Sequence, residues 1–121
     1  MKLLVSQTFE NLKLVSEANN TDHWREKHLR KKNIQWILSS LKEYIKHIHL
    51  PCIVKIVRIG PRPLDSDNLQ MSAKSVRDYI ASLLIPGKRV GRADDDTRIE
   101  WQYFQEKGKP KQYALRIEIY S

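Results

Sequence analysis

Residues 52–60 read "CIVKIVRIG", a run in which branched apolar side chains stand at both odd and even positions. A strand that is apolar on both faces is typical of the interior of a sheet, and β-branched residues favour extended backbone. We therefore predict that 52–60 is the central strand of the fold. Pro51 prevents any preceding helix from continuing into it, and "GPRP" at 60–63 ends it in a stiff loop.

Helical spacing of apolar residues appears on both sides of this strand. It predicts one helix over residues 22–48 and a second over 68–84. The first stripe consists of Leu29, Ile34, Ile37, Leu38, Leu41, Ile45 and Ile48, and the second of Leu69, Ala73, Val76, Ile80, Leu83 and Leu84. We expect Trp36 and Trp101 in the core, and Trp24 either in the core, in an interface or stacked on an unpaired base.

Alternating patterns predict the remaining strands. Residues 2–17 read as one or two short strands broken around Glu10 and Asn11, while 97–105 and 113–120 alternate as strands joined in a hairpin through "EKGKPK". The predicted class is α/β or α+β, with a small mixed sheet of four to five strands covered by two helices. The chain has 121 residues, which we interpret as one domain over 1–121.

The composition is strongly basic. Lys and Arg number 22 against 14 Asp and Glu, giving a formal net charge of +8, which favours nucleic acid over an acidic protein or an anionic membrane surface. Cys52 is the only cysteine, so no disulfide forms within the chain and a reducing compartment is expected. No stretch resembles a signal peptide or a membrane span, so we predict a cytoplasmic protein without a membrane partner.

Acidic residues are concentrated in two short stretches, "LDSDNL" at 64–69 and "ADDDT" at 93–97, which hold five of the fourteen. Asp65 follows the predicted central strand, whereas Asp95 and Asp96 precede the next one. If these strands are neighbours, we expect the two clusters to converge at one end of the sheet. Gathered carboxylates either have raised pKa values or bind a cation, and their hard oxygen atoms suit Mg²⁺ or Mn²⁺.

Structural explanations compete with this metal-site hypothesis. Asp67, with Gln70 three residues on, makes a good helix N-cap with a capping-box partner. Lys74 and Asp78 are spaced as an ordinary surface pair on a helix. The acidic run at 94–96 also fits a solvated loop that balances nearby basic residues. The sequence alone leaves both kinds of explanation open.

The combination of motifs resembles the RusA family of Holliday-junction resolvases, particularly the small RusA-like proteins of phages and prophages. The resemblance is carried by "LDSDNL", by a lysine in the following helix and by "ADDDTRIEW" at the start of a strand. It extends to "VSEANNTDHWREKHLRKK" near the beginning and to "IEWQYFQEKGKPKQYALRIEI" at the end. It therefore covers much of the chain.

This resemblance implies a Mg²⁺-dependent homodimeric endonuclease that nicks four-way DNA junctions symmetrically during recombination or repair. The family's paired acids fall on Asp65 and Asp67, and its later acid falls on Asp96 with Asp95 beside it. All four are candidate metal ligands. The family's catalytic lysine falls best on Lys74, one turn later than in the family pattern.

Basic side chains around these acids are predicted to bind DNA phosphates. They are Arg25, Lys27, Arg30, Lys31, Lys32, Arg62, Lys88, Arg89 and Arg92. Two alternatives to the nuclease hypothesis remain. One is a non-catalytic basic nucleic-acid-binding protein with a relic metal site, and the other is an interaction protein whose basic helix binds an acidic partner.

Overall fold

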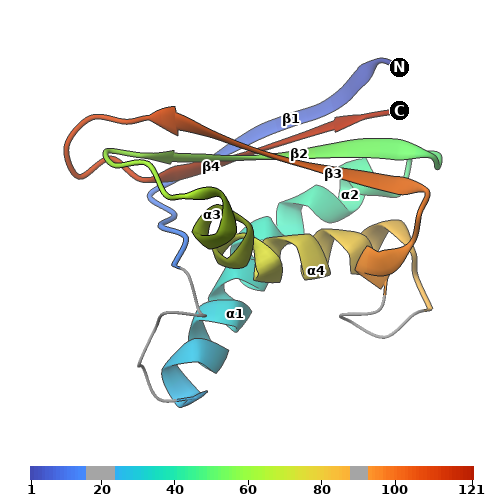
Figure 1. The fold of residues 1–121 in the computed structure, drawn as a ribbon. Coiled ribbons are helices and arrows are strands. Elements are labelled where there is room, and N and C mark those ends of the chain that lie inside the picture. The colour runs from blue at the N-terminus through green and yellow to red at the C-terminus, as the bar shows by residue number, and fades with distance from the viewer. Residues whose placement is uncertain (16–23, 88–92) are drawn as a thin grey trace.

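The computed structural model describes residues 1–15, 24–87 and 93–121, and it confirms the predicted fold class (Figure 1). Four strands form one mixed sheet in the order β1-β4-β2-β3. The strands are β1 (Leu3–Glu10), β2 (Cys52–Gly60), β3 (Ile99–Lys107) and β4 (Ala114–Tyr120). The helices are α1 (Trp24–Leu38), α2 (Lys42–Ile45), α3 (Ser66–Ser72) and α4 (Lys74–Leu84), with 3₁₀ turns η2 (Ser39–Leu41) and η3 (Ala93–Asp95).

The strand β2 is central, as predicted. It pairs in parallel with β3 on one side and antiparallel with β4 on the other. Its side chains Cys52, Val54 and Ile56 are at most 1% exposed, which places them in the core. The helices lie on one side of the sheet (Figure 1). Their burial against β2 explains why this run is so rich in apolar side chains.

The opposite face of the sheet is not covered by any helix of the described ranges (Figure 1). It carries a charged cluster in which Arg116 donates through Nε to Glu118 and through its terminal nitrogens to Glu106. Phe104 is 46% exposed on the same face. One side of the sheet is therefore core and the other is a charged surface.

The predicted hairpin between 97–105 and 113–120 is wrong. Strands β3 and β4 do not pair with each other, because each pairs with β2 from a different side. The connection crosses the end of β2, where the Gly108 backbone N–H donates to the Gly60 carbonyl at 2.8 Å. Alternation within a strand shows which side chains share a face, but it does not show which strand is the neighbour.

The single helix predicted over 22–48 is interrupted. Helix α1 ends at Leu38, and the Ser39 hydroxyl donates to the Trp36 carbonyl at 2.6 Å, a local bond that competes with the helical ladder. Leu38 is fully buried, whereas Leu29 is 58% exposed and Trp36 is 78% exposed. The expectation that Trp36 belongs to the core is therefore wrong, and Leu29 is not buried with the other end of its apolar stripe. They are seven residues apart and share the side of α1 that faces away from the core.

Trp101, by contrast, is partly buried against the core, as expected. Among the described helices, none combines the length and apolar character that crossing a membrane requires.

Candidate functional site

The first acidic cluster lies where the chain enters α3. Asp65 is the N-cap residue of this helix: its Oδ1 accepts the backbone N–H of Asn68 at 2.8 Å, and its Oδ2 accepts from the Asn68 side-chain amide at 3.1 Å. The prediction that Asp67 is the cap is wrong, because the helix begins at Ser66. Asp67 lies in the first turn with an exposed side chain. Of the two acids, Asp65 thus has a demonstrated structural role.

The turn that carries Asp65 is also fixed from the sheet. Gln105, on β3, accepts the backbone N–H of Leu64 at 2.9 Å and donates to the Leu64 carbonyl at 2.7 Å. These two bonds attach the loop to β3 one residue before Asp65. The acidic turn is therefore held by both α3 and β3.

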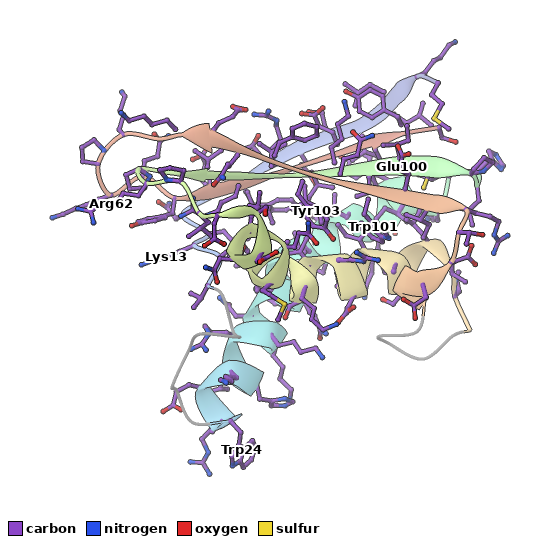
Figure 2. All side chains as sticks on the ribbon, viewed as in Figure 1. Lys13, Trp24, Arg62, Glu100, Trp101 and Tyr103 are labelled. Carbon is purple, nitrogen blue, oxygen red and sulfur yellow. The ribbon has the colours of Figure 1, made fainter. Side chains whose placement is uncertain are left out.

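A small groove of about 150 Å³ lies between the α3–α4 segment and β3, beyond this turn. We call it the α4 groove; it is lined by Gln70, Met71, Lys74, Arg77 and Tyr103. Figure 2 shows Tyr103 and Trp101 between β3 and α4. The Arg77 guanidinium donates to the Tyr103 hydroxyl at 2.8 Å and lies 5.1 Å from the centre of the Trp101 ring. These contacts hold the Arg77 side chain in place beside Lys74.

Asp78 differs from its expected role as half of a surface pair. Its carboxylate lies 3.9 Å from the Lys74 ammonium, but the Asp78 side chain is only 8% exposed, against 62% for Lys74. The difference arises because α4 contacts α1 and η3 and also contributes Val76, Ile80 and Ala81 to the core, and so buries more than one stripe. Asp78 is therefore a buried carboxylate on α4, beside the Lys74 side chain that lines the α4 groove.

In the second acidic cluster, Asp96 is neutralised locally. Asp96 precedes β3, and its Oδ1 accepts from the Arg98 backbone N–H and Nε at 3.0 Å each, while its Oδ2 accepts from Arg98 Nη2 at 2.9 Å. This bidentate pairing raises the pKa of the Arg98 guanidinium. The neighbouring Asp95 is exposed. Both oxygens of Asp96 are thus already engaged within its own chain.

The two acidic clusters do not converge within one chain. Strands β2 and β3 are indeed neighbours, but they are parallel, with Cys52 opposite Ile99 and Gly60 opposite Lys107. Asp65 follows the last residue of β2, and Asp96 precedes the first residue of β3. Leu64, beside Asp65, is bonded to Gln105, and Asp96 to Ile99; at about 3.3 Å per residue, the six residues of β3 between these points separate the clusters by roughly 20 Å. Among the described residues, no group of three His, Cys, Asp or Glu side chains lies close enough to share a metal ion.

The predicted DNA-binding residues fall in two regions of the described structure. Arg25, Lys27, Arg30, Lys31 and Lys32 all lie on α1, exposed or partly exposed. Trp24, 67% exposed, stands at the end of α1 farthest from the sheet (Figure 2). Arg62, labelled in Figure 2, is exposed in the loop that follows β2, three residues before Asp65 in the chain. Lys88, Arg89 and Arg92 lie outside the described residues.

Sequence reasoning missed Arg77, Tyr103 and Gln105. A signal for two of them was present, because Trp101, Tyr103 and Gln105 stand at alternate positions of one strand and therefore share a face. That this face meets the residues around Asp65 depends on the β2–β3 pairing, which no local pattern shows.

Neither a scan against models of known protein families nor a search of curated proteins gave a match for this chain. The resemblance to RusA-like resolvases therefore rests on the motifs quoted above and stays a prediction.

Proposed function

We propose that this protein is a Mg²⁺-dependent, structure-selective DNA endonuclease, similar to Holliday-junction resolvases, that nicks branched DNA during recombination or repair. The observation that carries the proposal is that Asp65 and Asp67 stand at the start of α3, whose later residues line the α4 groove together with Lys74 and Arg77 of α4. Carboxylates for a cation and fixed positive charges for phosphates are the two requirements of such a site.

The acidic pair has suitable chemistry for Mg²⁺, or for Mn²⁺. Mg²⁺ in phosphoryl-transfer sites is commonly held by one or two carboxylates, with water and substrate phosphates supplying the other ligands. Asp67 forms no hydrogen bond or ion pair with any residue in the described ranges, and each Asp65 oxygen retains a lone pair beyond its bond from Asn68. When bound, the ion would lower the pKa of a water molecule and polarise the phosphate.

The other residues of the groove would bind and orient the DNA. The Lys74 ammonium is exposed and would neutralise charge that develops on a phosphate oxygen. Arg77, held by Tyr103 and Trp101, would fix a neighbouring phosphate. Arg62, in the loop before Asp65, would contact a phosphate of the DNA backbone. The basic residues of α1 would hold a duplex arm.

The proposed active form is a homodimer, because a four-way junction offers two symmetry-related strands for cutting. One chain supplies only Asp65 and Asp67 to the site. A third carboxylate would have to come from a second copy, whose exposed Asp95 is the better candidate, because Asp96 would first have to leave Arg98. We place the protein in the cytoplasm: Cys52 is a free, buried thiol whose pKa burial raises to about 11, a state suited to a reducing compartment.

One observation favours a second candidate function, a non-catalytic nucleic-acid-binding protein with a relic metal site. Asp96 is fully engaged by Arg98, at the opposite end of the β2–β3 pair from Asp65. The exposed Trp24 and the basic residues of α1 need no metal to bind a nucleic acid.

A cleavage assay separates the two candidates. A labelled synthetic four-way junction is incubated with the protein in Mg²⁺, in Mn²⁺ or in EDTA, and binding is measured in parallel. The nuclease predicts symmetric nicks that need the metal and disappear in Asp67→Asn. Glu43→Gln, on α2, changes the charge equally at an exposed position and should cleave normally. Intact binding without cleavage in either metal would favour the relic site.

A further inference from the structure

A larger cavity, of about 360 Å³, lies at the end of β2 near the loop 60–63. Arg58, Pro61 and Pro63 line it, together with the last residues of β3. It is distinct from the α4 groove. Gln105 borders it and also holds Leu64, so the cavity adjoins the turn that carries Asp65. A volume of this size falls within the range of small-molecule sites.

The wall of this cavity contains a buried positive charge. Arg58 is 6% exposed; its Nη1 donates to the Arg62 carbonyl at 2.9 Å, while its Nε is buried and has no hydrogen-bond partner among the described residues. Burial lowers the pKa of the guanidinium, which nevertheless stays protonated at neutral pH. Glu106 also borders the cavity, but its carboxylate pairs with Arg116 on the other face of the sheet.

The backbone is shaped around this guanidinium. A Cβ atom at Gly60 would lie 2.9 Å from Arg58 Nη2 and 3.0 Å from Nη1. Glycine at this position therefore leaves room for the guanidinium to lie against the strand. A buried charge without a counter-ion lowers stability, and an apolar residue of similar size is commonly neutral or stabilising in its place. Its presence beside an open cavity indicates that an anion supplies the missing partner.

We propose that this cavity binds one phosphate group of a nucleic-acid strand, with Arg58 as its principal ligand and Lys107 at its rim. A guanidinium matches phosphate oxygens through two parallel N–H bonds. Pro61 and Pro63 offer apolar surface for a sugar, and the chain's net charge of +8 attracts polyanions in preference to isolated carboxylates. The identity of the ligand rests on the proposed function, since it assumes a nucleic-acid substrate, but binding here needs neither a metal nor cleavage.

The decisive experiment measures equilibrium binding of a labelled single-stranded oligonucleotide in EDTA, alongside the melting temperature of the free protein. Arg58→Met should melt at the same temperature as the wild type or higher, yet bind about tenfold more weakly or worse. Lys46→Met removes the same charge from an exposed site at the end of α2, outside the lining of the cavity, and should bind normally. Binding by Arg58→Met within twofold of wild type would overturn the proposal.

Gly60→Ala provides a second test that keeps the net charge unchanged. The added methyl group must displace the Arg58 guanidinium, so we expect oligonucleotide binding to weaken here as well. If Arg58→Met fails to fold, Gly60→Ala decides the matter, and unchanged affinity would contradict the proposal.

The source of the phosphate is identified by repeating the titrations with inorganic phosphate and with a mononucleotide. A strand phosphate is supported if both compounds displace the labelled oligonucleotide, each with a weaker affinity than the oligonucleotide itself, and if this displacement depends on Arg58. Arg58-dependent binding of the mononucleotide alone would overturn it in favour of a free-nucleotide pocket. The two proposals are tested separately. Junction cleavage by the wild type and its loss in Asp67→Asn test the nuclease proposal, whereas oligonucleotide binding in EDTA by the wild type and by Arg58→Met tests this inference. Either proposal can fail while the other holds.

Discussion

Gln105 uses both ends of its side-chain amide on a single residue, Leu64, whose N–H and carbonyl lie 2.9 and 2.7 Å away. The two residues are 41 positions apart in the chain. Because Leu64 directly precedes Asp65, this pair of bonds fixes the start of α3 to β3.

Substitution of Gln105 by alanine should loosen this turn. Two partly buried backbone groups would lose their partners, so we expect a loss of about 1–2 kcal/mol in the free energy of unfolding, measured with denaturant. Metal-dependent cleavage should fall more than DNA binding. Gln102→Ala, which removes a bond to exposed Glu100, is the matched control and should change stability by less than about 0.5 kcal/mol. Equal losses in the two variants would contradict the structural role.

Asp65 combines a structural and a proposed metal-binding role, which two substitutions separate. Asn is as good an N-cap as Asp, so Asp65→Asn should retain stability but lose metal-dependent cleavage, whereas Asp65→Ala should also lose about 1 kcal/mol. Thermal unfolding and the junction assay measure the two effects. Full cleavage by Asp65→Asn would rule out this carboxylate as a metal ligand.

The arginine cluster on the open face of the sheet predicts a pH dependence. Hydrogen bonds and charge from Arg116 lower the pKa of both Glu106 and Glu118 below the ordinary value of 4.5. Depressed folded-state pKa values add stability that is present above pH 4.5 and is lost as the pH falls through those values. Melting temperatures between pH 3 and 7 should therefore decline less steeply in Arg116→Met. Lys109→Met, a lysine with no carboxylate partner among the described residues, should keep the wild-type slope.

Substitution of Trp24 tests whether the exposed end of α1 binds single-stranded DNA. Because its side chain is 67% exposed, Trp24→Ala should change the free energy of unfolding by less than about 0.5 kcal/mol. If it stacks on a base, affinity for single-stranded DNA should fall about tenfold. Trp36→Ala removes a ring that is 78% exposed from another part of the helix and serves as the control. A similar loss in both variants would indicate a general effect of aromatic surface.

Local patterns predicted the strands and the general position of the helices, but not the breaks that divide 22–48 after Leu38 and 68–84 at Ala73, nor the arrangement of the elements. The apolar run at 52–60 identified the central strand, because one face of β2 is buried in the core and the other is only partly exposed between two neighbouring strands. The direction of β3 leaves no such trace. That direction places Asp96 beside Cys52 rather than beside Gly60, and it is why the predicted convergence of acids fails within one chain.

In the candidate site too, the motifs could be predicted from the sequence but the tertiary contacts could not. The motif around Asp65 was evident from the sequence, although the cap fell on Asp65 and not on Asp67, because boundaries of helices depend on tertiary contacts such as the one from Gln105. Nothing in the sequence indicated that Arg58 is buried, because a charged residue within a strand is normally expected on its exposed face. Only the packing around Gly60 reveals that it is enclosed.

The parallel course of β2 and β3 gives this small protein a built-in ruler. A span of roughly 20 Å along β3, from Ile99 to Gln105, corresponds to about six base-pair steps of a duplex, at about 3.4 Å per step. A subunit lying along DNA would therefore present its two acidic turns to phosphates about six base pairs apart, and not to the same one.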